Sequence, residues 1–435
     1  MTFSVGGTTV ITSDRIVQLT TGATASRPTE GSRVPGQLFF DTTLNKLIVW
    51  DGAAWRESIS STVATPSAWS WGQIVSSSGT IGDGTVIPRS SPVSIVGGFT
   101  DWVQISASAN FSIGLRANGT AWSWGTNSYG ALGINLSGAG TSRSSPVSVV
   151  GGFTDWVFVS NSFLGHTIGI RANGQAWAWG YNGRGQLGIN YTNDRSSPTS
   201  VVGGFTDWKQ VAGGRFHSVG VRANGTAWTW GFNQFGQLGN NTFYNTSSPV
   251  SVLGGFSDWT QVSAGWFHTL GVRSNGLAWS WGRNNSGQLA DYTTVYRSSP
   301  VSLIGGITDW VQVAAGGYHS LGLRANGTAR SWGNNSEGRL GDGTMTNRSN
   351  TVAVAGGFTN WVQLTAGFTT SMGIRSNGTA WAWGSNPYGR LGIGDTNYRV
   401  SPTSIVGGFT DWVQISAGNS HAAGLRTQPG RNRTG

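Results

Sequence analysis

The feature that most constrains the fold is a Trp-Gly dipeptide that recurs seven times at a nearly constant spacing. Its tryptophans are Trp71, Trp124, Trp179, Trp230, Trp281, Trp332 and Trp383, which lie 51 to 55 residues apart. A second motif, GGFTDW with small variations, also occurs seven times, beginning at Gly97, Gly151, Gly203, Gly254, Gly305, Gly356 and Gly407. A fixed period near 50 residues is typical of repeat architectures, and the candidates are propellers and solenoids.

Each repeat reads as four short strands. Residues 258–282 (DWTQVSAGWFHTLGVRSNGLAWSWG) contain three strand-like runs, and Asn-Gly between the last two favours a hairpin because both residues tolerate positive φ. The segment SPVSVLGGF supplies a fourth strand, with Pro249 at its start, where a missing N–H is harmless. The 69 glycines in 435 residues suit short strands and tight turns. Four antiparallel strands per repeat predict a propeller blade.

The two ends of the repeat region predict how the ring closes. Residues 66–72 hold a Trp-Gly strand without the strand that precedes it in other repeats, whereas residues 407–427 lack a Trp-Gly strand after them. We therefore expect an all-β, seven-bladed propeller whose N-terminal strand completes the last blade and leaves no open edge. The expected organisation is a β module at 1–57, a linker at 58–65, the propeller at 66–427 and a basic tail at 428–435.

Alternating tryptophans mark the third strand of most repeats, as in Trp122 with Trp124. A period of two places both indoles on one face, which we expect to pack against the next blade. Twenty of the 23 tryptophans occupy repeat positions. We interpret them as blade structure, although a stacking platform for bases or sugars is the alternative. The tryptophans expected to have this structural role include Trp124, Trp179, Trp230 and Trp281.

The combined pattern GxNxxGQLG…SP…HSLGLRxNGTAWSWG resembles the repeat of the regulator of chromosome condensation family, over about residues 66–427. The resemblance implies the seven-bladed fold. Family members include guanine-nucleotide exchange factors, protein inhibitors and a plant ultraviolet-B photoreceptor, so the fold alone selects no function. The exchange role implies singular charged residues on one face, which the uniform repeats do not reveal. The photoreceptor role implies interleaved Arg and Trp, but Phe267 stands where GWFHT would need Arg.

Candidate catalytic and metal-binding residues fall on repeat positions. The five histidines, His166, His217, His268, His319 and His421, share one position, which Phe111 and Thr370 occupy elsewhere. Because a catalytic group is usually singular, we expect buried histidines, His217 and His268 among them, that bond the backbone. GDGT at Gly82 and Gly341 favours a turn over a cation loop. Cysteine is absent. We expect no enzymatic activity, catalytic residue, metal or cofactor.

The net charge of +10 raises the question of nucleic acid. Thirteen arginines recur at two repeat positions and are spread around the ring, so we interpret the basicity as a product of the repeat and expect no nucleic-acid partner; a nucleic-acid surface is the alternative. No run of about 18 apolar residues predicts a membrane span. The first residues lack a basic start followed by an apolar run, so no signal peptide is expected.

The loops after each Trp-Gly vary most between repeats. They are rich in Asn, Thr, Ser and Tyr, which give adaptable hydrogen bonds and amphipathic rings. We consider them candidate recognition loops, with ordinary solvated loops as the alternative. The candidate residues are Tyr191, Asn193, Phe243, Tyr244, Tyr292, Tyr296 and Tyr398.

Residues 1–57 do not repeat. The segments QLFFDT and LIVWDG, joined by TLNK, predict a hairpin with an apolar face that is too small to hold a core of its own. It needs a partner: a further copy of itself, as in a trimer, the propeller, or another protein. The side chains expected to make this attachment are Phe39, Phe40, Trp50 and Trp55.

This head resembles a module of bacteriophage virion proteins, RPxxPxxGxxxFDTTLxKxxxWDGxxW. The matching residues are Arg27, Pro28, Gly36, Phe40, Asp41, Thr42, Thr43, Lys46, Trp50, Asp51, Gly52 and Trp55. The resemblance implies a non-enzymatic virion structural protein, a tail fibre or adhesin. Its head would bind other virion proteins, and its propeller would display a surface for host adhesion through a glycan or protein. The alternative is an intracellular interaction scaffold of the exchange-factor type.

Overall fold

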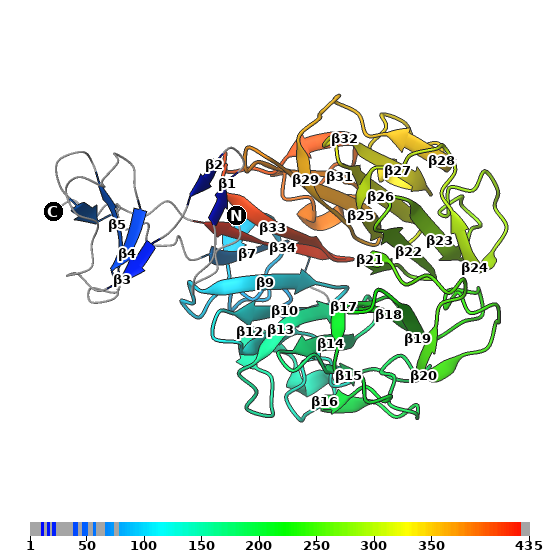
Figure 1. Ribbon diagram of the computed structural model, residues 1–435, viewed down its shortest axis with the longest axis horizontal. Coiled ribbons are helices and arrows are strands. Elements are labelled where there is room, and N and C mark those ends of the chain that lie inside the picture. The colour runs from blue at the N-terminus through cyan, green and yellow to red at the C-terminus, as the bar shows by residue number, and fades with distance from the viewer. Residues whose placement is uncertain are drawn as a thin grey trace. The chain divides into compact units, whose positions relative to one another are not determined.

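The computed structural model describes residues 10–12, 15–17, 20–22, 38–41, 46–50, 55–57, 66–73 and 78–427 (Figure 1). The chain divides into two units. One comprises Met1–Thr65 together with Pro429–Gly435, and the other comprises Pro66–Gln428.

The first unit contains short strands. β1 (Val10–Thr12) pairs with β2 (Arg15–Val17), and β3 (Thr20–Gly22), β4 (Leu38–Asp41), β5 (Lys46–Trp50) and β6 (Trp55–Glu57) form a sheet in that order. β4 and β5 are antiparallel, with Phe39 opposite Ile48, which confirms the predicted hairpin. Phe40 lies opposite Leu47 and Trp50 opposite Trp55. The side chains of the four predicted attachment residues lie outside the described part of the chain.

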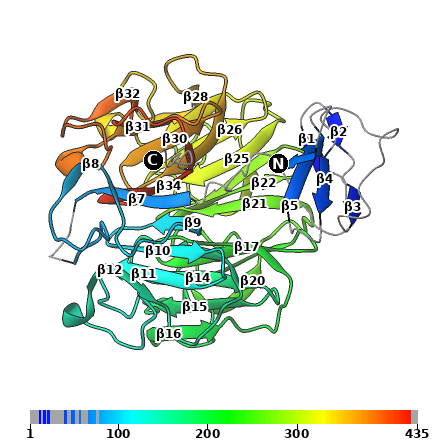
Figure 2. The ribbon, with the colours of Figure 1, turned by 90° about the vertical axis from the view of Figure 1, so that its left-hand side faces the viewer.

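The second unit is a seven-bladed propeller in which each blade is a four-stranded antiparallel sheet (Figures 1 and 2). Blade 1 is β9 (Trp102–Ala107), β10 (Phe111–Arg116), β11 (Ala121–Gly125) and β12 (Arg143–Ser148); blade 2 is β13 (Trp156–Asn161), β14 (His166–Arg171), β15 (Ala176–Gly180) and β16 (Arg195–Ser200); blade 3 is β17 (Trp208–Gly213), β18 (His217–Arg222), β19 (Ala227–Gly231) and β20 (Thr246–Ser251).

The next three blades repeat this order. Blade 4 is β21 (Trp259–Ala264), β22 (His268–Arg273), β23 (Ala278–Gly282) and β24 (Arg297–Ser302); blade 5 is β25 (Trp310–Ala315), β26 (His319–Arg324), β27 (Ala329–Gly333) and β28 (Arg348–Ala353); blade 6 is β29 (Trp361–Ala366), β30 (Thr370–Arg375), β31 (Ala380–Gly384) and β32 (Arg399–Ser404). Loops after the third strands carry the short 3-10 turns η3 (Ala139–Thr141), η4 (Ser336–Gly338) and η5 (Pro387–Gly389). Within the described residues, no helix has the length and apolar content needed to span a membrane.

Blade 7 closes the ring with strands from both ends of the propeller. It consists of β33 (Trp412–Ala417), β34 (His421–Thr427), β7 (Pro66–Gly72) and β8 (Arg89–Ser94). β34 and β7 run antiparallel from the His421–Gly72 pair to the Thr427–Pro66 pair. This confirms the predicted closure by residues 66–72. The sheet has no terminal gap because the two incomplete repeats supply complementary strands.

The hairpin between the second and third strands requires glycine. In blade 3, Gly225 has φ +75°, and a Cβ on it would collide with the carbonyl oxygen of Ser257 in the connection to blade 4. Only glycine combines this left-handed conformation with so close a backbone approach. The Asn-Gly signal therefore sets the hairpin and also the approach of the following blade.

Tryptophans fill the space between blades. Trp230 is fully buried, packs at 5.8 Å from Trp208 in the same blade, and belongs to the same core cluster as Leu187 of blade 2. The indole N–H of Trp230 donates to the backbone oxygen of Gln186, also in blade 2, at 2.9 Å. The expectation that these indoles pack against the next blade is therefore wrong, because the tryptophan-bearing face of each third strand meets the preceding blade. The opposite face carries small residues such as Ala178, which receive the tryptophans of the following blade.

Glutamine side chains link the inner strands, which line the centre of the ring. Gln210 Nε2 donates to the carbonyl oxygen of Val262 at 3.1 Å, and the Val262 N–H donates back to Gln210 Oε1 at 2.9 Å. This exchange imitates a pair of β-ladder hydrogen bonds across two separate sheets. Blade 2 has Phe158 at the equivalent position, so its junction with blade 3 lacks the glutamine bridge.

Candidate functional site

The five histidines form a buried row between blades. His217 Nε2 lies 2.9 Å from the hydroxyl of Thr269 in blade 4, and that hydroxyl donates to the backbone oxygen of Gln237 at 2.8 Å. Because the hydroxyl proton is used, His217 must donate from Nε2 and leave Nδ1 unprotonated. The predicted backbone partner is therefore wrong for His217, whereas His421 does have a backbone hydrogen bond, with Ala109. The hydroxyl of Thr269 lies between the His217 ring and the backbone oxygen of Gln237, because the ring reaches across the junction to the second strand of the next blade.

Burial holds these histidines neutral. It lowers the pKa of His166, His217 and His268 to about 3 and that of His421 to about 4. His217 and His268 have no exposed surface, so neither can touch a substrate. Among the described residues, no group of three or more His, Cys, Asp or Glu is placed to hold a metal ion.

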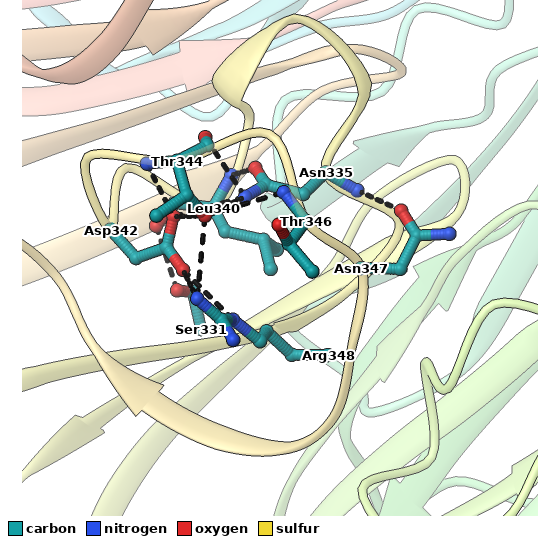
Figure 3. A network of polar contacts seen from close by, with 8 residues as sticks. All are labelled: Ser331, Asn335, Leu340, Asp342, Thr344, Thr346, Asn347 and Arg348. Carbon is teal, nitrogen blue, oxygen red and sulfur yellow. Dashed lines mark hydrogen bonds and ion pairs between the residues drawn. The ribbon is translucent and has the colours of Figure 1, made fainter.

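The GDGT loop at Gly341 is held by its own polar groups (Figure 3). Asp342 Oδ1 accepts hydrogen bonds from the N–H of Thr344 at 3.0 Å and from Asn335 Nδ2 at 2.9 Å, while Oδ2 pairs with Arg348 at 2.9 Å. Burial opposes ionisation, but hydrogen bonds from Thr344 and Arg348 outweigh it and lower the pKa of Asp342. Both oxygens are occupied by donors, which agrees with the turn predicted from the sequence and leaves no ligand set for a cation.

The predicted recognition residues lie on the outer loops of blades 2, 3, 4 and 6. The exposed fractions are 43% for Tyr191, 51% for Phe243, 80% for Tyr244, 59% for Tyr292, 38% for Tyr296 and 51% for Tyr398, and Asn193 is also exposed. Each loop also bonds the following blade, as the Asn190 N–H that donates to the backbone oxygen of Ser247 shows. Within the described residues, no ring contact joins the aromatic side chains of this set to one another, so they do not form one constellation. Tyr296 reaches inward and contacts Phe235 at 5.4 Å. Their role in recognition stays a prediction.

The structure reveals a second candidate site that sequence reasoning missed. At one end of each blade, the turn before the second strand meets the loop after the third strand, as the pairing of His217 with Gly231 shows. In blades 3 to 6 this end carries a set of touching rings and guanidinium groups. We call it the aromatic–arginine cluster, and it comprises Arg215, Phe216, Phe232, Phe235, Trp266, Phe267, Arg283, Tyr318 and Phe368.

Stacking across three blades organises the cluster. Trp266 of blade 4 stacks on Phe368 of blade 6 with ring centroids 3.8 Å apart and planes at 19°. Gly317 occupies the same repeat position in blade 5, the blade between these two. A Cβ on Gly317 would collide with the ring of Phe368. The stack therefore depends on a glycine at a position where Arg215 and Trp266 stand in the two preceding repeats.

Two arginines lie over these rings. The guanidinium of Arg215 is 4.1 Å from the ring centre of Trp266 and 4.7 Å from that of Phe216. Arg283 lies 5.2 Å from both Phe235 and Tyr318. Cation–π contacts of this kind contribute about 0.5–2 kcal/mol, depending on exposure. The aromatic rings thus hold two positive charges at fixed places.

Neither positive charge is neutralised by the protein. Within the described residues, Arg215 and Arg283 form no ion pair, whereas the repeat arginine Arg222 pairs with Asp207 at 2.8 Å. Burial lowers the pKa of Arg215, because the folded chain partly desolvates this cation. Trp266, Tyr318 and Phe368 are half-buried and keep part of their rings accessible. The arrangement suits a ligand that combines a carboxylate with apolar groups.

A sequence signal for the cluster exists at the position directly before each histidine. It is aromatic in three consecutive repeats, Phe216, Phe267 and Tyr318, and non-aromatic in the four others: Asn110, Gly165, Thr369 and Ser420. Such a block of variation within a uniform repeat indicates a site. Which residues from neighbouring repeats join it depends on the ring geometry.

Comparison with protein families identifies the repeat. The regulator of chromosome condensation (RCC1) repeat matches residues 173–221, 224–272, 275–323 and 377–425. A second description of the same repeat matches 102–131, 208–237, 259–288, 310–339 and 361–390. Together these ranges cover more than half of the chain, which belongs to the RCC1 repeat family.

The chain is also similar to individual proteins and solved structures. The ultraviolet-B receptor UVR8 of Arabidopsis thaliana is 27% identical over 348 residues, covering 77% of each chain. The mitochondrial RCC1 domain-containing protein RUG3 of the same plant is 27% identical over 317 residues, covering 68% of each. Among solved structures, Prp20p of Saccharomyces cerevisiae superposes with a TM-score of 0.75 at 20% identity, covering 84% of this chain and 92% of Prp20p. Human WBSCR16 gives 0.73 at 21% identity, covering 83% and 98%. These structural likenesses establish the fold alone.

Proposed function

We propose that this chain is a non-enzymatic protein-binding propeller that holds an acidic, partly apolar segment of a partner on the aromatic–arginine cluster. The observation that carries the proposal is the pair of guanidinium groups of Arg215 and Arg283, fixed over aromatic rings without a carboxylate partner. Propellers of this fold engage other proteins: the structure of Prp20p is described together with its binding to Gsp1p and histones, and yeast RCC1 has been solved bound to Kap60.

The chemistry of the cluster favours a peptide over a bare anion. A carboxylate can replace water at a guanidinium through charge-assisted hydrogen bonds, while apolar side chains cover the exposed parts of Trp266 and Phe368. Arginine and tryptophan are also the residues in which binding energy concentrates at protein interfaces. The preset ring positions reduce the side-chain entropy lost on binding.

The absence of enzymatic activity is part of this proposal. Its support is that His217 and His268 are fully buried and engaged in inter-blade contacts, and that Asp342 is occupied by its own turn. The polar groups that would supply acid–base chemistry serve the fold in these places.

The test uses two fluorescein-labelled decapeptides, one of alternating glutamate and leucine and one with glutamine in place of glutamate. We expect the intact chain to bind the acidic peptide more tightly, with an affinity that falls as salt rises. The Arg215→Glu/Arg283→Glu variant should weaken binding by at least about tenfold, since two attractive contacts become repulsive. Anisotropy titration measures both effects.

A matched control lies at the other end of the same blade. Lys209 is exposed one residue after Trp208, whose strand position pairs with Arg222, far from the His217 end. Lys209→Glu changes the net charge in the same sense and should leave peptide affinity within about twofold. Equal loss in this control, or equal binding of the glutamine peptide, would reject the cluster as the site.

A second candidate function is virion attachment through the head, with a host-surface glycan or protein as the propeller's ligand. The observation that favours it is the pairing of β4, which carries Phe40 and Asp41, with β5, together with the sequence resemblance given above. It predicts that residues 1–57, fused to another protein, enter phage particles, and that a chain beginning at Ser58 does not. Immunoblots of purified virions from the producing host would score both, and normal incorporation of the headless chain would overturn it.

A further inference from the structure

A pocket of about 260 Å³ opens between blades 1 and 2, at the same end of the propeller as the aromatic–arginine cluster. Its walls include Asn110, Phe111, Thr126, Ser128, Tyr129 and Leu164. They come from the turn before β10, the loop after β11 and the turn before β14. The pocket thus lies at a blade junction, where two repeats contribute side chains.

Two repeat positions beside the pocket carry short residues. Asn110 directly precedes the histidine position, where blade 3 has Phe216, and Thr126 directly follows the Trp-Gly glycine, where blade 3 has Phe232. Phe216 and Phe232 lie 5.8 Å apart and both contact Phe267 of the next blade, so their junction is filled with rings. Asn and Thr are shorter, and they leave the corresponding space between blades 1 and 2 open.

The polar groups of the pocket lack partners. Thr126 Oγ1 is buried and makes no hydrogen bond in the structure. Within the described residues, no hydrogen bond is made by the side chains of Asn110, Ser128 and Tyr129 either, of which Ser128 and Tyr129 are exposed to solvent. A buried hydroxyl without a partner is unfavourable in an isolated fold, which points to a ligand or to water as its partner.

The lining also includes apolar groups. Phe111 is 2% exposed and Leu164 is partly buried, while Tyr129 is 41% exposed and packs against Tyr181 with ring centroids 4.8 Å apart. No Asp, Glu, Lys, Arg or His lines the pocket. The ligand should therefore be neutral, with one face of C–H groups for the tyrosine ring and several hydroxyls for Asn110, Thr126 and Ser128.

We propose that the pocket between blades 1 and 2 binds one neutral hexopyranose ring, either as a free sugar or as the terminal residue of a glycan. A pyranose presents C–H bonds on one face and hydroxyls around its edge, which matches a lining that combines aromatic rings with hydroxyl and amide groups. The volume is smaller than the roughly 300–1,000 Å³ of pockets that hold drug-sized ligands, which restricts the occupant to a single ring. This site is separate from the acidic-peptide site and does not rest on it.

The direct test is saturation-transfer NMR of the intact chain with the methyl glycosides of glucose, galactose, mannose and N-acetylglucosamine. At least one should receive saturation, strongest at the protons of one ring face. Thr126→Phe copies the residue of blade 3 and should fill the pocket, raising the dissociation constant by at least about tenfold, because the ring and a side chain cannot share the space. Tyr129→Ala should raise it through loss of the stacking wall, and it serves if Thr126→Phe does not fold.

The matched control is Tyr388→Ala. Tyr388 occupies in blade 6 the repeat position of Tyr129 and is 55% exposed, but it does not line the pocket. We expect the Tyr388→Ala variant to bind the sugar with the same affinity as the unaltered chain. A glycan array then separates the two sources, since capture of glycans ending in the preferred sugar indicates a glycan ligand and its absence a free sugar. Lack of saturation for all four glycosides, or binding that Thr126→Phe and Tyr129→Ala leave unchanged, would overturn the proposal.

Discussion

The junction between blades 3 and 4 and the junction between blades 1 and 2 have the same backbone arrangement. They differ in the side chains that lie between the blades. In the first, His217 bonds Thr269, and Phe216, Phe232 and Phe267 pack together. In the second, Phe111 replaces the histidine and a pocket opens beside it. The positions that every repeat shares therefore build the ring, whereas a few positions at one end decide whether a junction is closed, charged or hollow.

Deleting residues 66–72 should have the largest effect, because it removes the strand that both kinds of junction depend on for a closed ring. β7 supplies the ladder to β34 and the fully buried Trp71. Loss of a buried tryptophan alone costs about 3–5 kcal/mol, so we expect a loss of more than about 5 kcal/mol in the free energy of unfolding. Denaturant unfolding followed by fluorescence measures it. An unchanged midpoint would contradict closure by this strand.

Acid should weaken the histidine junctions selectively. The folded pKa of His217 is about 3, below its ordinary value of 6.5, so the unfolded chain binds a proton that the folded chain refuses. Stability is therefore present above about pH 6.5 and falls as the pH drops toward 3, by up to about 1.4 kcal/mol per pH unit for each such histidine. Unfolding titrations between these values would show it. A flat profile would mean that the histidines are hydrated and protonated in the folded state.

Replacing His217 with Phe gives blade 3 the residue type that blade 1 has at this position, where Phe111 stands. The change removes the bond to Thr269, and we expect a cost of about 1–3 kcal/mol at pH 7. Because one titrating group is lost, the slope of stability against pH should also fall by up to about 1.4 kcal/mol per unit. His217→Ala provides the comparison: it should give the same slope with a larger loss at pH 7. An unaltered slope in both variants would show that His217 does not drive the acid response.

Phe158→Gln should have the smallest effect and the opposite sign. Blade 2 alone has Phe in place of the inner-strand glutamine, so its junction with blade 3 lacks the exchange that Gln210 makes with Val262. Two new hydrogen bonds, each worth about 0.5–1.5 kcal/mol, offset the lost burial of the phenyl ring. We expect a small gain in unfolding free energy. The reverse change, Gln210→Phe, should lower stability, and a gain there would contradict the bridging role.

The ring itself could be predicted from the sequence because its information is periodic. Seven Trp-Gly pairs gave the blades, and the complementary ends at 66–72 and 407–427 gave the closure. The direction in which Trp230 packs could not be predicted, since it depends on which face of a twisted sheet meets the preceding blade. The hydroxyl partner of His217 was missed for a related reason: the side chain crosses to a strand about 50 residues away.

The candidate sites were harder to predict from the sequence, because each is formed by residues that depart from the repeat in several blades at once. Trp266 and Phe368 stand in blades 4 and 6, and they meet only because Gly317 leaves room between them. The pocket beside Thr126 lies where Asn110 and Thr126 have shorter side chains than their counterparts in blade 3, Phe216 and Phe232. Variation between repeats is most visible in the outer loops, which is why the sequence pointed there. The attachment role of Phe39, Phe40, Trp50 and Trp55 stays a prediction.

The central claim, that ligand recognition resides at the cluster end of the ring, is best tested by locating a bound acidic peptide. A decapeptide of alternating glutamate and leucine with a photoreactive terminus would be cross-linked to the intact chain and mapped by mass spectrometry. We expect cross-links in residues 214–216, 265–267 and 316–318, and their loss in Arg215→Glu/Arg283→Glu. Cross-links concentrated on the outer loop at Phe243 and Tyr244, or around Lys209 at the opposite end, would contradict the account.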